Sequence, residues 1–279
     1  MTLFEVYKQS IKDLNNPDVE EINIRILLCE INNLKSMSDF YLQKDKEIRD
    51  LPRYQKYFAR YLKGEPVQYI LGKTEFLGNE ILVDKRVLIP RQESEEVVDF
   101  AITKTHEIFG SKTIDLADVC CGSGVMGISL SKKLNVGKVW FSDISKKAID
   151  VAKLNCEHNK IKGNFICGDS LDKLISNKVK VDLLISNPPY ILREENIDNS
   201  VLDYEPHLAL FADETFSIYR SIISNLENIK NNTLLAVFEI GNNTRKVLEP
   251  FIKEKYPNAE YAFLKDMNKK ERILYIVLK

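Results

Sequence analysis

The sequence contains no apolar run long enough to cross a membrane. Its apolar stretches, such as residues 234–238, are far shorter than the ~20 residues that a membrane-spanning helix requires. Residues 1–5 contain no basic region followed by an apolar stretch, which is the pattern of a secretory signal. We therefore expect a protein that neither spans a membrane nor carries a secretory signal.

Cysteine and histidine are scarce, and their spacing argues against two further classes. The five cysteines are an odd number without C-x-x-C spacing, and the three histidines form no cluster in the sequence. These residues are Cys29, Cys120, Cys121, Cys156, Cys167, His106, His158 and His207. The pattern argues against a disulfide framework or a zinc site, and it predicts a reducing, cytoplasmic environment and no metal centre. Adjacent cysteines bridge only with strain, which disfavours a redox pair at residues 120–121.

An excess of positive charge is also absent. Lysine and arginine total 40, aspartate and glutamate total 41, and the formal net charge is −1. Residues 1–75 are balanced too, with 12 basic and 12 acidic side chains. Proteins that bind nucleic acid through its phosphates usually carry a basic excess or stripe, so the balance disfavours a nucleic-acid substrate, although a sum leaves a local basic patch open.

The first 63 residues have the pattern of helices. Apolar residues fall on one helix face over residues 19–34, and a second, aromatic stripe ends at Gly64, a plausible helix stop. The two stripes consist of Ile22, Ile26, Leu27 and Ile31, and of Tyr54, Tyr57, Phe58, Tyr61 and Leu62. We predict that the aromatic stripe lies in the core of a helical bundle, with a partner-docking surface as the alternative.

From residue 74 onward the pattern changes to strands. Residues 74–77 and 81–83 enclose Gly78-Asn79, which is typical of a hairpin. Predicted strands follow at 113–119, 138–142, 164–167, 181–186 and 234–239, predicted helices at 94–109, 125–134, 145–159 and 216–228, and two edge strands at 261–264 and 272–278. This alternation predicts an α/β fold with a doubly wound, mostly parallel sheet, which binds ligands at the carboxyl ends of its strands.

Unusual residues follow the first three of these strands. Asp118-Val-Cys-Cys-Gly-Ser-Gly124 leads into a helix, and Gly122 and Gly124 allow a ligand to approach the backbone closely. Asp143 stands at a spacing typical of an acidic residue that binds ribose hydroxyls, and Asp169 is placed to bind an adenine amino group. Either aspartate could instead cap a helix, but the coincidence at three strand ends favours a nucleoside site. With Gly127 the glycines also fit G-x-G-x-x-G, so this turn alone leaves a dinucleotide open.

Asn187-Pro-Pro-Tyr190, after the fourth strand, is the strongest signal in the sequence. A residue before proline is held in extended geometry, and prolines offer carbonyl acceptors without N–H donors. We predict that the Asn187 side-chain oxygen and the Pro188 carbonyl accept the two N–H bonds of a planar NH₂ group, while the Tyr190 ring packs on its face. The structural alternative is a proline turn with a buried tyrosine.

Such a site suits methylation of a planar nitrogen. An amide or aromatic-amine nitrogen is a poor nucleophile because its lone pair is delocalised. Two accepted hydrogen bonds raise its electron density and stabilise the positive charge that develops as it attacks a methyl carbon. Alignment with the methyl–sulfur bond of S-adenosylmethionine (SAM) contributes further, and the reaction requires neither a strong base nor a metal. The expected cofactor is therefore SAM, with S-adenosylhomocysteine as product.

The motif resembles that of SAM-dependent amino-methyltransferases, which include adenine-N6 and glutamine-N5 enzymes. Several blocks narrow the resemblance to the PrmC/HemK-type release factor glutamine methyltransferases. These blocks are residues 64–72, 75–76, 87–91 with Glu93 and Glu95, 204–210, 219–220, 239–241 and the stretch around Arg272. The resemblance covers about residues 60–279, whereas residues 1–60 agree only in helical character.

The resemblance implies a Rossmann-like methyltransferase domain at 91–279, a β-hairpin linker at 74–90 and a small helical, substrate-holding domain at 1–73. It implies that peptide chain release factors are the partners and that the glutamine of their Gly-Gly-Gln motif is methylated at N5. The cofactor-binding residues would be Asp118, Cys120, Cys121, Gly122, Ser123, Gly124, Asp143, Asp169, Ser170 and Asn187. The catalytic and substrate-binding residues would be Asn187, Pro188, Pro189 and Tyr190.

Two residues depart from the family pattern. Cys120 stands where the cofactor loop usually has its first glycine, which would narrow the methionine end of the pocket. Gln92 stands where a proline usually follows Arg91, which would loosen that turn. The long connection at 191–215 is a candidate lid over the glutamine, since connections of more than ~12–15 residues are often lids or binding loops.

Two other functions remain as alternatives. An adenine-N6 methyltransferase acting on DNA or RNA would require a base-flipping or single-strand groove and usually a basic surface, which the charge balance disfavours. A binding module would keep the cofactor fold without chemistry, and the intact Asn187 motif argues against it.

Overall fold

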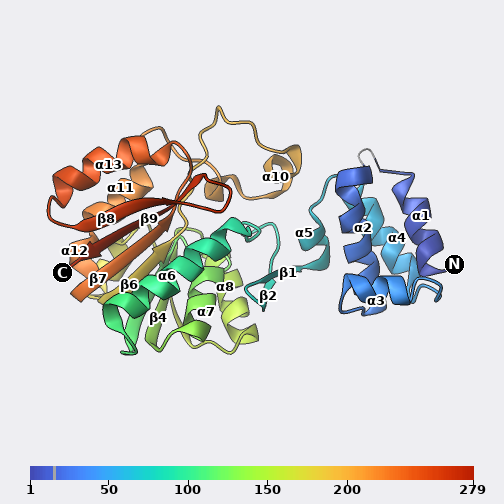
Figure 1. Ribbon diagram of the computed structural model, residues 1–279, viewed down its shortest axis with the longest axis horizontal. Coiled ribbons are helices and arrows are strands. Elements are labelled where there is room, and N and C mark those ends of the chain that lie inside the picture. The colour runs from blue at the N-terminus through green and yellow to red at the C-terminus, as the bar shows by residue number, and fades with distance from the viewer. Residues whose placement is uncertain (15–16) are drawn as a thin grey trace. The chain divides into compact units, whose positions relative to one another are not determined.

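The computed structural model describes residues 1–14 and 17–279, and the chain divides into two compact units (Figure 1). The first unit consists of Met1–Lys73 together with Ile197–Tyr204, and the second of Thr74–Asn196 together with Glu205–Lys279. The chain therefore returns to the first unit for one short segment late in the sequence. Within the described residues, no helix is long and apolar enough to cross a membrane.

The first unit is helical. Its elements are α1 (Leu3–Ile11), α2 (Pro17–Asn32), α3 (Met37–Leu42), α4 (Leu51–Tyr61), α5 (Val67–Leu71) and the late helix α10 (Asn199–Tyr204). Side chains fix several helix starts: Thr2 with Glu5 and Ser36 with Asp39 form capping boxes, in which each side chain satisfies a free backbone N–H. The Tyr204 hydroxyl donates to the Lys63 carbonyl (2.9 Å), which fixes the end of α10 within this unit.

The buried face of α2, in the core of the first unit, differs partly from the prediction. Leu27 and Ile31 are buried as expected, but Ile22 is 43% exposed. The buried stripe of α2 instead includes Ile24 and Leu28, which follow the i, i+3, i+4, i+7 spacing with the other two. The aromatic stripe of α4 packs into the same core, except for Leu62, which is 49% exposed because the helix ends at Tyr61.

The hairpin consists of β1 (Lys73–Phe76) and β2 (Asn79–Leu82). Its turn lies at Leu77-Gly78, one residue earlier than predicted, because both residues have positive φ (47° and 73°), as a tight primed turn requires. In the second unit, Asn155 accepts from the Leu82 N–H (2.6 Å) and donates to the Leu82 carbonyl (2.9 Å). The end of the hairpin is thus tied to α8 (Lys146–His158).

The second unit is built on a seven-stranded sheet in the order β5-β4-β3-β6-β7-β9-β8. The strands are β3 (Ile114–Val119), β4 (Val136–Asp143), β5 (Gly163–Cys167), β6 (Val181–Ser186), β7 (Lys230–Glu239), β8 (Glu260–Lys265) and β9 (Glu271–Leu278). Within this sheet β3 to β7 pair in parallel, and β9 pairs antiparallel with both β7 and β8. The predicted doubly wound α/β fold is confirmed. Of the two predicted edge strands, only β8 lies at the edge of the sheet, because β9 lies between β7 and β8.

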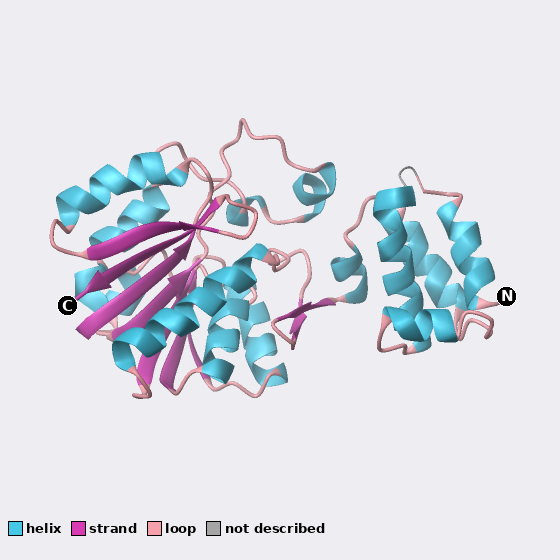
Figure 2. Ribbon diagram, viewed as in Figure 1, coloured by secondary structure: helices cyan, strands magenta, loops and turns pink. Residues whose placement is uncertain are grey.

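Helices cover both faces of this sheet, as Figures 1 and 2 show. One face carries α6 (Glu93–Phe109), α7 (Val125–Lys133) and α8, and the other carries α11 (Ser217–Ser224), α12 (Leu226–Ile229) and α13 (Thr244–Lys255). The short helix α9 (Asp172–Ser176) packs with the second group through Leu174. The predicted helix at 216–228 is two helices separated at Asn225, and α13, which contains Pro250, is a further helix outside the predicted set.

The parallel pairing brings the carboxyl ends of β3, β4, β5 and β6 together along one side of the sheet, called the carboxyl edge. In the register, Val119 lies opposite both Ser142 and Ser186, and Asp143 lies opposite Cys167. The Ser186 hydroxyl donates to the Val119 carbonyl (2.6 Å), which links the starts of the loops after β3 and β6. The strand order reverses between these two strands, so ligands are expected here.

Candidate active site

A cavity of about 260 Å³ lies at this edge, within the second unit. Nine of the predicted site residues line it: Cys120, Cys121, Gly122, Ser123, Asp143, Asp169, Ser170, Asn187 and Pro189. The other four, Asp118, Gly124, Pro188 and Tyr190, are not among the lining residues. We call the loops at 120–123, 143–145 and 168–170 the cofactor wall, and we call Arg91, Ser94, Asn187, Pro189 and residues 206–213 the acceptor wall.

The loop after β3 is built on left-handed backbone. Cys120, Gly122 and Gly124 have φ of 57°, 52° and 79°. A side chain in this conformation costs about 1–2 kcal/mol, so Cys120 is held in a backbone geometry that a glycine would adopt without strain. Burial raises the pKa of both the Cys120 and the Cys121 thiol, and both cysteines are free. Neutral thiols are weak nucleophiles, so the pair is unsuited to redox or nucleophilic chemistry.

Asp118 supports the cofactor wall from behind. It is buried, its carboxylate accepts the Gly127 N–H (2.8 Å), and burial raises its pKa. A Cβ atom on Gly127 would lie 2.6 Å from the Phe141 ring and 2.9 Å from the Asp118 Cβ. The third glycine of the G-x-G-x-x-G pattern is therefore explained by the close packing of α7 against the sheet.

Asp143 ties two parts of the cofactor wall together. One carboxylate oxygen accepts the Gly122 N–H (2.9 Å), and the other accepts the Ser145 N–H (2.8 Å). Burial raises the Asp143 pKa, against the effect of these two bonds. The side chain that caps α8 is that of Ser145, which accepts from Ala148 (3.3 Å). Each Asp143 oxygen keeps acceptor capacity for a ligand hydroxyl.

The turn after β5 presents two polar side chains to the cavity. Asp169 is exposed and does not cap α9, whose N-cap residue is Leu171. Ser170 has φ of 48° and is buried, and its hydroxyl has no hydrogen-bond partner within the described residues. A buried hydroxyl without a partner is costly unless a ligand or water satisfies it, so this turn suits a polar ligand.

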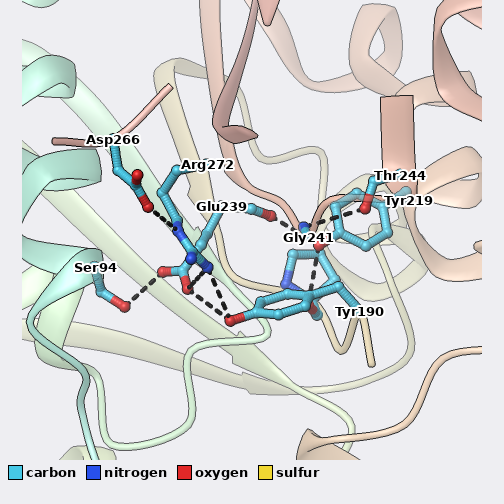
Figure 3. Close-up of polar contacts among 9 residues, drawn as sticks. Ser94, Tyr190, Tyr219, Glu239, Gly241, Thr244, Asp266 and Arg272 are labelled. Carbon is cyan, nitrogen blue, oxygen red and sulfur yellow. Dashed lines mark hydrogen bonds and ion pairs between the residues drawn. The ribbon is translucent and has the colours of Figure 1, made fainter. Parts of the chain in front are cut away.

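Only two of the four residues of the Asn187 motif line the cavity. Asn187 and Pro189 line the cavity, whereas Pro188 is buried with its carbonyl 3.1 Å from the Tyr219 hydroxyl. The Tyr190 ring packs against Gly241, and its hydroxyl lies 3.2 Å from Glu239 and 3.3 Å from Arg272 (Figure 3). Stacking of Tyr190 on a planar group in the cavity therefore remains a prediction.

Sequence reasoning missed most of the acceptor wall. Arg91, Ser94 and residues of the segment 206–213 line the cavity, and Arg91 forms an ion pair with the buried Glu205 (2.5 Å). Glu205 also accepts the Ile89 N–H (3.0 Å). Arg91 and Glu205 both lie in sequence blocks that resemble the family, which could have marked them as functional. Nothing in the sequence indicates that these two residues contact each other.

The loop at 191–215 is closed at its base. Ile191 donates to the Leu210 carbonyl (3.1 Å), and its own carbonyl accepts the Ala212 N–H (2.9 Å). Residues 197–204 of the loop belong to the first unit, whereas Phe211 and Ala212 line the cavity in the second. Whether the loop closes over a substrate remains a prediction.

The residues at this edge fit SAM. Two carboxylates (Asp143 and Asp169) suit a ribose and an adenine amino group, and the Ser170 hydroxyl is available to a polar ligand. Within residues 1–14 and 17–279, no group of three or more His, Cys, Asp and Glu side chains is arranged to hold a metal ion.

Family models match both units. The Methyltransferase small domain matches residues 94–203, and the PrmC N-terminal domain matches residues 5–72. The second match covers the region where the sequence alone had indicated only helical character.

Curated relatives match most of the chain. A release factor glutamine methyltransferase from Staphylococcus aureus is 37% identical over 77% of this chain and 77% of its own length. One from Bacillus subtilis is 32% identical over 98% of this chain and 96% of its own length.

Solved structures share the fold. A 16S rRNA N2 G1207 methyltransferase from T. thermophilus, in complex with AdoMet and guanosine, is similar with a TM-score of 0.54 at 12% identity, over 85% of this chain and 54% of its own. A ribosomal protein L11 methylase from Lactobacillus delbrueckii subsp. bulgaricus has a TM-score of 0.50 at 17% identity, over 69% and 81% of the two chains. The relatives show the family, and the fold and the cavity residues agree with it: the chain belongs to the release factor glutamine methyltransferases, a family of SAM-dependent enzymes.

Proposed function

We propose that this chain transfers the methyl group of SAM to the side-chain amide nitrogen, N5, of the glutamine in the Gly-Gly-Gln motif of peptide chain release factors. The observation that carries the proposal is that Asn187 and Pro189 line the same cavity as Asp143, Asp169 and Ser170. An amide acceptor and a nucleoside-containing donor would therefore be held next to each other. The curated relatives, named for release factor glutamine methylation, support this choice of acceptor.

Two carboxylates and the turn after β5 would hold the adenosine part of the cofactor. Asp143 and Asp169 would bind the ribose hydroxyls and the adenine amino group, and Ser170 would find its missing partner. The left-handed loop at 120–124 would allow the methionine part to approach the backbone. When bound, the cofactor supplies an electrophilic methyl group.

Asn187 and Pro188 would hold the glutamine amide by its two N–H bonds. The Pro188 carbonyl has the Tyr219 hydroxyl near it, but a carbonyl oxygen has two lone pairs, so one remains for the substrate. Accepting both bonds raises the electron density on the amide nitrogen and stabilises the charge that develops as it is methylated. The proton that the nitrogen then carries is acidic enough to pass to water.

Several finer points belong to the same proposal. The helical domain at 1–73 would help to hold the release factor. The free cysteines and the nature of the substrate support action in the cytoplasm.

One assay tests the proposal. Labelled SAM is supplied with a release factor, with the same factor carrying Gln→Ala in its Gly-Gly-Gln motif, or with DNA and RNA. We expect label only in the unchanged release factor. Label that persists in the Gln→Ala factor would refute the glutamine as acceptor, and label in nucleic acid would support adenine-N6 methylation instead.

A further inference from the structure

Glu239, the last residue of β7, is a buried carboxylate beside the Asn187 motif. It is 1% exposed, and burial raises its pKa, although the Ser94 hydroxyl and Arg272 act in the opposite direction. Ser94 donates to one of its oxygens (2.5 Å), and the Tyr190 hydroxyl donates to the other (3.2 Å). Figure 3 shows these side chains converging from separate elements. The predicted chemistry of the site assigns Glu239 no role.

Glu239 reaches the motif at a second point through its main chain. The Tyr219 hydroxyl lies 2.7 Å from the Glu239 carbonyl and 3.1 Å from the Pro188 carbonyl. Tyr219 is fully buried on α11, and its single hydroxyl proton is shared between the two carbonyls, more closely with that of Glu239. One residue of β7 is therefore linked both to Pro188 and to Tyr190.

Arg272 completes the group from β9. Its guanidinium donates to the Tyr190 hydroxyl (3.3 Å) and to Asp266 (3.2 Å), and it lies 3.9 Å from the Glu239 carboxylate. Asp266 is buried and also accepts the Lys270 N–H (2.9 Å). The guanidinium is thus held in place by a second carboxylate, and the Tyr190 hydroxyl receives one hydrogen bond and donates another.

The Tyr190 ring has little freedom to move. A Cβ atom on Gly241 would lie 2.8 Å from its Cδ2 atom, so the ring lies directly against the backbone that follows β7. The ring and the hydroxyl are thereby held from two directions, by packing on one side and by Glu239 and Arg272 at the tip.

We propose that Glu239 and Arg272 are positioning residues for methyl transfer: their side chains hold Tyr190 in the geometry that the acceptor amide requires, and the Glu239 main-chain carbonyl helps to fix the Pro188 carbonyl through Tyr219. The inference rests on the proposed function, since it assigns these residues to the amide site. A buried ion pair is a weak way to stabilise a fold, because desolvation of the charges offsets their attraction. A role in fixing one geometry accounts for the arrangement better, and the Ser94 link places the same group beside the cavity wall.

The test compares Glu239→Gln, Tyr190→Phe and their double variant in full-length protein. We expect each single change to lower kcat by about 10- to 100-fold, since a small misplacement of a reacting group has that effect. KM for the release factor and Kd for SAM should stay within about 3-fold of wild type. Because both changes break one chain of contacts, the double variant should be little worse than either single one, whereas independent effects would multiply.

Gly241→Ala gives a second, independent measurement. It removes no polar group but pushes the Tyr190 ring, and it should lower kcat in the same way. Asp182→Asn is the matched control: Asp182 lies on β6, accepts from Asp115 and Asn231, and touches none of these residues, so its kcat should not change. Thermal unfolding of every variant separates lost stability from lost positioning.

The outcomes separate the inference from the proposed function. A wild-type protein that does not methylate release factor would refute the proposed function before any variant is compared. If wild type is active and Glu239→Gln and Gly241→Ala keep its kcat, the positioning role is wrong. A multiplicative double variant, or a loss confined to thermal stability, would also overturn it and leave Glu239 with a structural role.

Discussion

The two walls of the cavity are assembled in different ways. The cofactor wall is made by loops that directly follow β3, β4 and β5, and its hydrogen bonds join residues close in sequence, 21 apart for Gly122 with Asp143 and 2 apart for Asp143 with Ser145. The acceptor wall is held by distant contacts, 114 residues apart for Arg91 with Glu205 and 145 apart for Ser94 with Glu239. The first can be recognised in a sequence as a set of strand-end motifs, whereas the second exists only in the folded sheet.

The largest expected effect is a fall in kcat without a change in SAM affinity, when Asn187 of the acceptor wall is substituted. Asn187→Ala removes the acceptor for one amide N–H, and we expect kcat to fall by about 10²- to 10³-fold, as for loss of one group that stabilises developing charge. Kd for SAM, measured by calorimetry, should stay within a few-fold of wild type. Loss of SAM binding instead would mean that Asn187 belongs to the cofactor wall.

The opposite result is expected on the cofactor wall. Asp143→Ala leaves the Gly122 and Ser145 N–H groups without their acceptor and removes the proposed ribose contact. Each lost partner costs about 1–3 kcal/mol, so Kd for SAM should rise about 10- to 100-fold. At saturating SAM, kcat should stay within a few-fold of wild type, and a fall in kcat with unchanged Kd would contradict the division into two walls.

A smaller effect concerns the strained start of the cofactor wall. Cys120→Gly relieves a side chain held at φ of 57°, and we expect the free energy of unfolding to rise by up to about 1 kcal/mol. Urea unfolding measures this change, with Cys167→Gly, at an exposed position outside the left-handed set, as the control. A variant that is less stable than wild type would show that packing of the thiol outweighs the backbone strain.

The smallest effect tests a local contact within the acceptor wall. Asp213 accepts from the Ser217 and Thr215 hydroxyls, which lowers its pKa to about 2. A lowered pKa means that ionised Asp213 stabilises the fold above its ordinary pKa and that this stabilisation is lost as the pH falls toward about 2. Asp213→Asn should therefore be less stable than wild type at pH 5, and the gap should narrow at pH 3. Because Asp213 is exposed, the gap should be under about 1 kcal/mol. A gap that is independent of pH would exclude the ionised form as its source.

Much of the second unit could be predicted because periodicity along the chain reports it directly. The strands at 114–119 and 181–186 are buried on both faces, as near-continuous apolar runs indicate. Errors arose where two local signals competed. Gly78-Asn79 is a favourable turn pair and predicts the hairpin turn one residue late, and Pro250 lies inside α13, where the residue type disfavours a helix that packing nevertheless stabilises.

The sequence by itself predicted the fold class and the cofactor, which are confirmed, and it gave a hypothesis for the chemistry of the acceptor site. Glycines, aspartates and prolines at strand ends impose backbone geometry and hydrogen-bonding capacity through local physics, which a sequence displays. Only the tertiary structure decided that Tyr190 packs against Gly241, that Glu239 meets both Tyr190 and Tyr219, and that Arg91 pairs with Glu205. These contacts depend on the order of seven strands, which brings residues more than 80 positions apart within hydrogen-bond distance, as Tyr190 and Arg272 show. No local pattern carries that information.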